Sequence, residues 1–210
     1  MKVIILHGLY MHGMVMQPLS QKLQKLGYDS AVISYNTLSI NEETVFNQID
    51  HALAPNTPNI LVGHSLGGLM IKHYLAARPN NSNRISHVVA IGSPLRGASI
   101  AMKIQDMGFG ALLGNSPHYG LDEHDDVWLF PQKLGSIAGT TPVGLRPLLM
   151  GNGHMSDGTV TVEETKIKGM TDHIEIRGSH TAMIYTNYVP NQIDHFIRFG
   201  LFKHRQTTTV

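Results

Sequence analysis

Short apolar runs alternate with helix-period segments along the first half of this chain. Candidate strands occupy residues 3–6, 29–35, 59–62 and 87–91. Each of the first three is followed by apolar residues that recur at helical spacing. Repeated strand–helix units produce a parallel sheet with right-handed crossovers and helices on both of its faces. We therefore expect an α/β fold built around one mostly parallel sheet.

Two of the helix-period segments carry signals for where a helix begins or ends. The first stripe consists of leucines, with Pro18 near its start and Gly27 at its end. The second stripe follows Ser39 and Glu42, whose S-x-x-E spacing is that of a capping box. We expect helices that begin near Pro18 and near Ser39.

The second half of the chain contains two more candidate strands and a closing helix. Strands are expected at residues 134–138 and 174–176, which makes about six strands in all. A last amphipathic stripe begins near Pro190 and stops at Gly200. The alternation therefore resumes after an interruption and continues almost to the C-terminus.

The interruption lies between about residues 97 and 134. It contains glycines, prolines and the acidic run 122–126. Large apolar residues are nevertheless too frequent for a solvated loop, and they are Met102, Ile104, Met107, Phe109, Leu112 and Leu113. We expect this insertion to pack as a cap within a single domain that covers residues 1–202. The polar tail at residues 203–210 is expected to fray.

Charge and length exclude several classes of protein. The 16 Lys and Arg residues are balanced by 15 Asp and Glu residues and lie scattered, so no partner nucleic acid is expected. With no cysteine, thiol chemistry and disulfides are excluded. The apolar run at residues 3–6 is too short for a signal peptide, and no segment approaches the ~20 apolar residues that span a bilayer. We expect a cytoplasmic protein without a transmembrane segment; peripheral contact with lipid and the oligomeric state stay open.

One serine stands between glycines where an apolar strand gives way to a helix. The segment GHSLGG at residues 63–68 follows the candidate strand 59–62. In a nucleophile elbow, Ser65 would lie in a strained turn, and Gly63 and Gly67 would let neighbouring backbone pass without Cβ clashes. The alternative is a plain tight turn. The strand before this segment and the helix stripe after it favour the elbow.

A serine hydroxyl is a poor nucleophile unless a base and an orienting carboxylate assist it. Asp157, in the segment SDGTV, and His180, in the segment GSHT after the last strand, follow the serine. Serine, then acid, then histidine is the chain order that accompanies a nucleophile elbow between a strand and a helix. Asp-Gly is also a plain turn signal, so Asp157 competes with Asp172 and with the acidic run 122–126. Asp172 stands at the wrong end of its strand, and the acidic run is expected to be a solvated face.

The base has competitors too, because the chain contains 13 histidines. His173 precedes the last strand and His195 lies in the closing helix, so neither stands at the C-terminal end of a strand. His7 and His64 flank the first loop and the elbow, where we expect them to pack and form hydrogen bonds. His180 remains the preferred base.

At four separated segments the chain resembles the α/β-hydrolase superfamily, and within it the small bacterial lipases and carboxylesterases with a near-minimal fold. The segments are HGL at 7–9, GHSLGG at 63–68, SDGTV at 156–160 and GSHT at 178–181. The segment GSPLRG at 92–97 looks like the turn that leads into the cap of that family. Together these segments cover nearly the whole domain.

The resemblance implies a role for each candidate residue. Ser65 would be the nucleophile, His180 the general base and then acid, and Asp157 the carboxylate that orients the imidazole. The oxyanion would be held by the backbone N–H of Leu66 and by one N–H from the first loop, most simply that of Leu9. The first loop is not glycine-rich, so the N–H of Tyr10 is the alternative donor.

The activity implied is hydrolysis of a small-molecule carboxylic ester through an acyl-enzyme intermediate, with no cofactor. Because the insertion is apolar, we expect the ester to have an apolar acyl or alkyl part. The same triad could instead cleave thioesters or transfer the acyl group to another alcohol. A non-catalytic binding scaffold is the alternative from another class.

Two further clusters have competing interpretations. His118 and the acidic and histidine residues of 122–126 carry metal-binding atoms, but they lack the spacing of an EF-hand or of a zincin helix. We expect no metal there. The 11 methionines are adaptable packing residues. Five of them could also line an acyl pocket, namely Met11, Met14, Met16, Met102 and Met107.

Overall fold

A sheet of six parallel strands forms the centre of the computed structural model, which describes residues 1–120, 127–151 and 153–204. The strands are β1 Lys2–Leu6, β2 Asp29–Ile33, β3 Asn59–His64, β4 Ile85–Ile91, β5 Lys133–Gly139 and β6 Asp172–Ile176. They lie in the order β2-β1-β3-β4-β5-β6, and every neighbouring pair is parallel. The expected α/β fold with about six strands is confirmed, and the sheet is wholly parallel.

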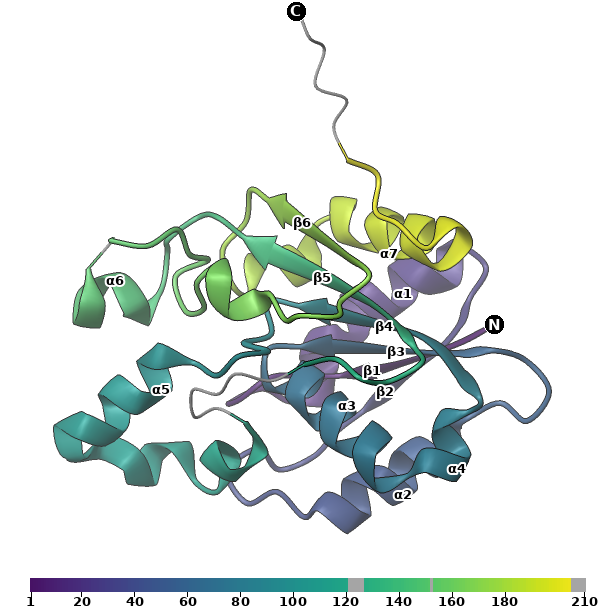
Figure 1. The fold of residues 1–210 in the computed structure, drawn as a ribbon, viewed down its shortest axis with the longest axis horizontal. Coiled ribbons are helices and arrows are strands. Elements are labelled where there is room, and N and C mark those ends of the chain that lie inside the picture. The colour runs from purple at the N-terminus through teal and green to yellow at the C-terminus, as the bar shows by residue number, and fades with distance from the viewer. Residues whose placement is uncertain (121–126, 152, 205–210) are drawn as a thin grey trace, which may run out of the picture.

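Helices cover both faces of this sheet, as expected (Figure 1). Helices α2 and α3 pack on one face, and α1 and α7 pack on the other. Their bounds are α1 Gln17–Lys25, α2 Glu42–Ala52, α3 Leu66–Ala77 and α7 Tyr188–Phe199. The shorter helices are α4 Pro79–Ser82, α5 Ser99–Ile104 and α6 Leu145–Met150. Single helical turns occur at η1 Gly13–Met16, η2 Gln105–Phe109, η3 Gly110–Leu113, η4 Ser116–Tyr119, η5 Glu163–Thr165 and η6 Ala182–Tyr185.

Alternating side chains of the central strands supply two apolar cores. In β1, Ile4 and Leu6 join the core under α2 and α3, whereas Val3 and Ile5 join the core under α1 and α7. None of these four side chains is accessible to solvent. Successive residues of a strand point to opposite faces, so a strand covered on both faces is apolar throughout. The two cores thereby hold the C-terminal ends of the strands, where the predicted functional loops begin.

The signals for helix ends hold in α1 and α7. Pro18 lies in the first turn of α1, and Gly27 follows that helix at φ +93°. Gly200 ends α7 at φ +76°, a conformation that glycine adopts without steric cost. Helix α7 begins at Tyr188, two residues before the predicted start at Pro190.

The predicted capping box at Ser39 is wrong. Helix α2 begins at Glu42, and the side chain of Asn41 accepts a hydrogen bond from the N–H of Thr44 at 2.9 Å. Asparagine caps a helix as well as serine does, so the residue next to the first helical turn takes the role. The helix itself was predicted correctly, whereas its first residue was not.

Strand bounds also differ from the sequence predictions by two residues. Strand β2 ends at Ile33 rather than at position 35, and β4 begins at Ile85 rather than at position 87. Strand β6 begins at Asp172, so His173 lies inside it rather than before it. Pairing with a neighbouring strand sets these limits, and the local sequence does not contain that information.

The insertion follows β4 and begins with α5. Figure 1 shows α5 and α6 at the same end of the molecule, beyond the C-terminal ends of the strands. Leu134 belongs to β5, so the insertion ends before Lys133. The acidic run 122–126 and the tail residues 205–210 lie outside the described residues. Within the described ranges, no helix is long and apolar enough to cross a membrane.

Candidate active site

Ser65 stands between the last residue of β3 and the first residue of α3, in a strained backbone conformation. Its φ is +53° and its ψ is −123°, and in the described chain only one other non-glycine residue, Tyr10, has a positive φ. A Cβ on Gly67 would lie 2.5 Å from the carbonyl oxygen of Leu6, and one on Gly63 would lie 2.4 Å from a backbone nitrogen. Both glycines are therefore required for the turn, as the elbow motif predicts.

Asp157 and His180 are in direct contact. The Nδ1 of His180 lies 2.7 Å from Oδ2 of Asp157, with the histidine side chain 12% and the aspartate side chain 1% exposed. A carboxylate oxygen can only accept, so Nδ1 of His180 carries the proton and Nε2 keeps a free lone pair. This tautomer is the one that a general base for a serine requires.

Two loops bring these residues together. His180 follows β6 directly, whereas Asp157 lies in a turn well after the end of β5. The other carboxylate oxygen of Asp157 accepts the backbone N–H groups of Thr159 and Val160 at 2.9 and 2.8 Å. The backbone N–H of His180 donates to the carbonyl oxygen of Asp157 at 2.9 Å. Asp157 therefore forms the Asp-Gly turn and also contacts His180, so the two interpretations of this residue do not exclude each other.

Ser65 and His180 line the same cavity. In the part of the chain that the structure describes, the hydroxyl of Ser65 makes no hydrogen bond, to His180 or to any other residue. Contacts between a nucleophile and its base are often long in unliganded enzymes and tighten only when substrate binds. The structure therefore places Asp157 in direct contact with His180. Ser65 and His180 line the same cavity without a hydrogen bond between them.

The backbone around Ser65 offers two N–H groups for an oxyanion. Leu66 is the first residue of α3, so its N–H has no acceptor one turn earlier in the helix. In the first loop, the N–H of Tyr10 donates to Oγ1 of Thr37 at 3.1 Å, whereas the N–H of Leu9 has no acceptor among the described residues. Of the two alternatives, Leu9 is therefore the donor that remains available.

His64 is completely buried and tied to the loop of His180. Its Nε2 lies 2.9 Å from the backbone carbonyl oxygen of His180, and the two rings are 4.7 Å apart. A carbonyl accepts, so His64 is protonated on Nε2, and its Nδ1 has no partner in the described chain. Burial, reinforced by the nearby His180 ring, lowers the pKa of His64 to about 3. His64 remains neutral beside His180 throughout the physiological range.

The low pKa of His64 makes the fold sensitive to acid. The unfolded chain binds a proton at this histidine below about pH 6.5, whereas the folded chain does so only near pH 3. Stability is therefore fully present above about pH 6.5 and falls by up to about 1.4 kcal/mol per pH unit below it. The free energy of unfolding, measured with urea, should fall less between pH 7 and pH 5 in His64→Gln than in the native protein. Glutamine does not titrate, and it keeps a hydrogen-bond donor at the same position. Equal losses in the two proteins would contradict this role.

His7 supports the first loop. The N–H of Tyr35 donates to Nε2 of His7 at 3.2 Å, and Nδ1 of His7 lies 3.0 Å from the carbonyl oxygen of Gly8. The hydroxyl of Tyr35 donates in turn to the carbonyl oxygen of His7 at 2.8 Å, and the two rings stack. Burial lowers the pKa of His7. The packing roles expected for His7 and His64 agree with these contacts.

The cavity that contains Ser65 has a volume of about 260 Å³ and a mostly apolar lining. The insertion contributes Ala98, Ile100, Ala101, Ile104 and Leu113. Of the five methionines proposed as lining residues, only Met11 reaches it. Met16 lies in the core under α1, and Met14 is 72% exposed, so the methionine prediction is largely wrong.

A buried polar network joins the turn of Asp157 to the insertion, and the sequence analysis missed it. The carboxylate of Glu164 accepts the backbone N–H groups of Ser99 and Thr161, both at 2.7 Å. The guanidinium of Arg146, 5% exposed, lies 3.8 Å from Glu164 and donates to the hydroxyl of Ser99 at 2.7 Å. The backbone N–H of Glu164 donates back to Oγ1 of Thr161 at 3.2 Å, which completes a capping box. In the sequence, the T-x-x-E spacing of Thr161 and Glu164 indicated this capping box.

Removing the charge of Glu164 should destabilise the protein strongly. Glu164→Gln leaves the buried Arg146 without a counter-charge, and the expected loss of unfolding free energy is about 3 kcal/mol. Glu163→Gln is the matched control, because its carboxylate is exposed and paired with Lys166 at 2.6 Å; it should cost less than about 1 kcal/mol. Denaturant titration measures both. Similar losses in the two variants would show that the Arg146–Glu164 pair carries no special stability.

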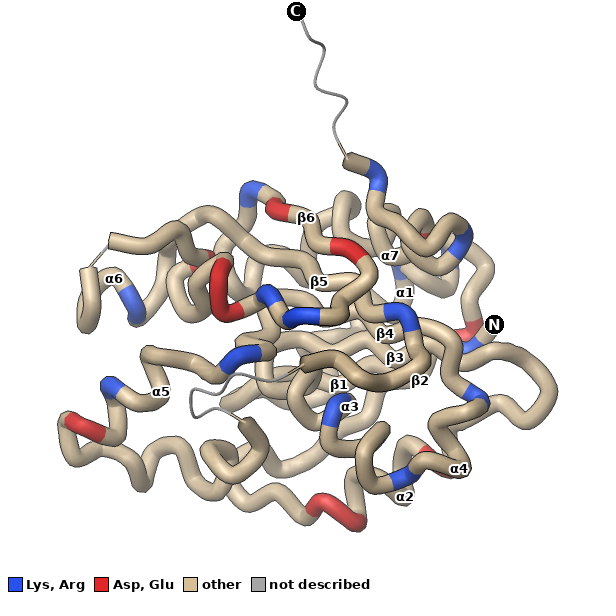
Figure 2. Tube along the Cα trace, in the orientation of Figure 1, with Lys and Arg blue, Asp and Glu red and all other residues tan. Residues whose placement is uncertain are grey.

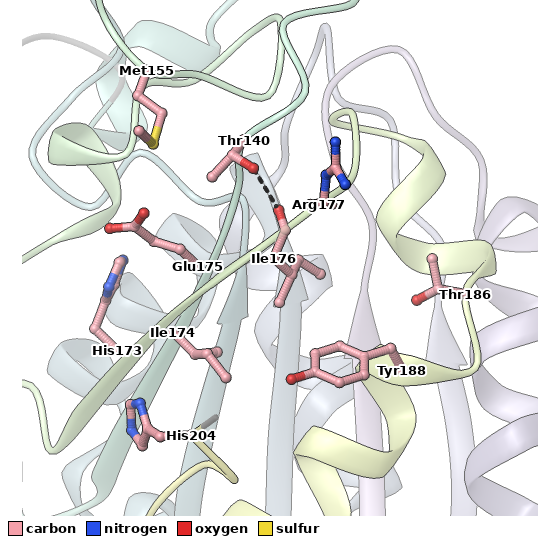
Figure 3. Close-up of a pocket in the computed structure, with 10 residues that line it drawn as sticks. All are labelled: Thr140, Met155, His173, Ile174, Glu175, Ile176, Arg177, Thr186, Tyr188 and His204. Atoms are coloured by element: carbon pink, nitrogen blue, oxygen red, sulfur yellow. Dashed lines mark hydrogen bonds between the residues drawn. The ribbon is translucent and has the colours of Figure 1, made fainter. Parts of the chain in front are cut away.

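A larger cavity, about 760 Å³, lies away from Ser65 along the edge strand β6. Figure 3 shows its lining, including His173, Glu175 and Tyr188. His173 is occupied there by a contact of its Nε2 with the hydroxyl of Thr165 at 3.0 Å. His195, the other competitor for the base, is half-buried on α7 with its Nδ1 2.8 Å from the carbonyl oxygen of Leu201. Neither histidine reaches the cavity of Ser65.

Charge around the described molecule is mixed. Figure 2 shows lysines and arginines interspersed with acidic residues around the outside of the molecule, whereas the central strands β3 and β4 carry none. Among the described residues there is no group of three or more histidine and acidic side chains that could hold a metal ion. The cluster considered from the sequence lies outside them, apart from His118.

The fold is similar to that of known bacterial hydrolases. The mature form of the Bacillus licheniformis lipase BlEst2 matches with a TM-score of 0.68 and 17% identity, over 94% of this chain and 90% of that chain. Its propeptide form gives a TM-score of 0.70 and 18% identity, over 100% of this chain and 52% of that longer one. The metagenomic carboxyl esterase MGS0156 gives a TM-score of 0.67 and 15% identity, over 86% and 64%. No family sequence model matches the chain, and no curated protein is similar to it in sequence.

The chain therefore has the α/β-hydrolase fold, which the resemblance of its four segments implied. Sequence identity to these structures is 15–18%, so the similarity establishes the fold alone. One fold hosts many reactions, and the function has to be argued from the site itself.

Proposed function

We propose that this protein is a serine hydrolase of carboxylic esters, with Ser65, His180 and Asp157 as its catalytic residues. The observation that carries the proposal is the buried contact between His180 and Asp157 beside a cavity that contains the strained Ser65. A nucleophile, a correctly protonated base and a carboxylate that orients the base are the parts that acyl transfer needs. The similar structures include a lipase and a carboxyl esterase, which supports the same reaction class.

The reaction proceeds through an acyl-enzyme. Ser65 Oγ attacks the ester carbonyl carbon while Nε2 of His180 takes the hydroxyl proton. The bond to the alcohol oxygen then breaks as His180 returns this proton to the leaving alcohol. Water, with His180 as its base, attacks the acyl-serine ester and releases the acid. Asp157 stabilises the imidazolium in both steps.

The oxyanion formed in each step lies at the backbone N–H groups of Leu66 and Leu9. Both groups are free of intramolecular acceptors among the described residues. Donors that are already in place need no rearrangement when charge develops on the carbonyl oxygen, and they stabilise it strongly in a site shielded from water.

The cavity favours a neutral, apolar substrate of moderate size. Among the described residues its lining contains no Asp, Glu, Lys or Arg, and its polar groups are few: Ser65, His180, Thr159, Thr181 and Tyr10. A volume of about 260 Å³ lies just below the ~300–1,000 Å³ of most small-molecule pockets, so the cavity is small for a ligand site. We therefore propose esters with a short to medium apolar acyl chain.

Labelling and turnover test the proposal together. A fluorophosphonate should form one covalent adduct, which mass spectrometry of peptides places on Ser65. A series of p-nitrophenyl esters should give the highest kcat/KM at an acyl length that fills the cavity, with a decline for longer chains. Absence of both the adduct and turnover would rule out the serine hydrolase and leave the binding scaffold.

Thioester cleavage and acyl transfer use the same catalytic residues. The cavity itself does not distinguish an alcohol from a thiol as leaving group, because His180 protonates either one. Matched acyl esters and acyl thioesters, each assayed with and without an added alcohol, separate the three activities. A higher kcat/KM for the thioesters, or ester products in place of acid, would replace ester hydrolysis as the main reaction.

A further inference from the structure

Tyr10 has an unusual conformation in the first loop. Its φ is +58°, which is strongly disfavoured for a bulky residue, and its side chain is 62% exposed. Both ends of the residue are held: the backbone N–H donates to Thr37, and the phenol hydroxyl donates to the carbonyl oxygen of Leu112 in the insertion. A strained conformation persists only where the surroundings fix it. The loop and the insertion thus hold the Tyr10 side chain in one place.

Tyr10 borders two cavities. The cavity of Ser65 and a second one of about 620 Å³ share two lining residues, Tyr10 and Met11. The second cavity is lined beyond them by His12 and by residues 34–38, in the loop after β2. It contains neither Ser65 nor His180. Tyr10 and Met11 therefore lie between the reaction cavity and a larger space.

The position of His180 determines which part of the ester lies next to Tyr10. His180 must protonate the leaving alcohol, so the alcohol lies on the side of Ser65 where His180 stands. Along the sheet, Ser65 follows β3 and His180 follows β6, whereas Tyr10 follows β1, on the opposite side of β3. The acyl chain, which leaves the carbonyl carbon away from the alcohol, therefore runs toward Tyr10.

We propose that Tyr10 determines acyl-chain length by closing the acyl end of the cavity, and that the space beyond it is a second acyl subsite. This inference rests on the proposed ester hydrolysis. With Tyr10 in place, the acyl chain is limited to the cavity of about 260 Å³. Shortening the side chain opens this cavity into the neighbouring one of about 620 Å³. The exposed phenol needs no core packing, so the wall can be removed without removing the fold.

Truncation of Tyr10 tests the proposal. The assay compares kcat/KM for p-nitrophenyl dodecanoate with that for the butanoate, in the native protein, Tyr10→Ala and Tyr10→Leu. The ratio should rise by about tenfold or more in Tyr10→Ala and by less in Tyr10→Leu, because binding energy from added methylenes becomes available. Tyr10→Phe loses the hydrogen bond to Leu112 but keeps the ring, so it should retain the native preferred length.

Tyr185→Ala is the matched control, since Tyr185 is 49% exposed and lines neither cavity. A native enzyme that hydrolyses esters while the ratio stays unchanged in Tyr10→Ala and Tyr10→Leu would overturn the role of Tyr10 alone. A native protein without Ser65-dependent turnover would overturn the proposed function instead. A shift in Tyr10→Phe equal to that in Tyr10→Ala would mean that the hydrogen bond, not the ring, sets the length.

Discussion

Replacing Ser65 with alanine is expected to lower kcat for ester hydrolysis by about 10⁴-fold or more and to abolish fluorophosphonate labelling. Without Oγ no acyl-enzyme forms, and only the oxyanion donors and substrate binding remain to assist water. The hydroxyl makes no hydrogen bond within the described residues, so its removal costs the fold little. Steady-state kinetics and thermal unfolding of the purified variant measure the two effects.

Ser86→Ala provides the control for Ser65→Ala. Ser86 lies at the start of β4, at the end of the sheet opposite to the cavity, and its hydroxyl contacts the carbonyl oxygen of Asn59 at 3.4 Å and Nδ1 of the neighbouring His87 at 2.9 Å. The Ser86→Ala variant should keep native turnover. Substantial turnover by Ser65→Ala, with native stability, would mean that another group performs the reaction.

Replacing Asp157 with asparagine is expected to lower kcat by about 10⁴-fold while leaving KM little changed. The amide can donate to Nδ1 of His180, which moves the imidazole proton to Nε2 and removes the lone pair that Ser65 needs. The imidazolium formed during attack also loses its counter-charge. The amide oxygen can still accept the N–H groups of Thr159 and Val160, so the turn itself should persist.

Asp29→Asn makes the same chemical change away from the cavity. Asp29 begins β2, is exposed, and pairs with Lys2 at 2.9 Å, so its neutralisation should leave kcat within about twofold and cost less than about 1 kcal/mol of stability. A native kcat in Asp157→Asn would indicate that a different carboxylate orients His180. Asp172 would not qualify, because its oxygens contact His204 and the N–H of Phe202.

Most of the architecture was predictable from short-range patterns. Alternating strand and helix segments predicted a parallel sheet with helices on both faces, because these patterns reflect which side of each element is buried. Element ends were less predictable. At α2 the cap is Asn41 and not the predicted Ser39, and at β6 the pairing with β5 added Asp172 and His173 to the strand.

Part of the candidate site was likewise predictable from the sequence, and part was not. Chain order and strand ends were enough to select Ser65, Asp157 and His180, and the structure brings the last two into contact. The choice between Leu9 and Tyr10 depended on Thr37, which lies on a different loop, and no local pattern contains that partner. The network around Glu164 likewise joins three separate segments, of which only the T-x-x-E spacing was visible.

The sequence by itself therefore determined the elements, the order of the chemical groups and the strained turn of Ser65. These properties depend on neighbours along the chain: side-chain period, glycines that admit close backbone, and the position of a residue at a strand end. The tertiary structure alone decided which loops meet, which N–H groups stay free, and that Tyr10 stands between two cavities. Those properties depend on the lateral order of the strands, which brings distant segments within hydrogen-bonding and packing distance.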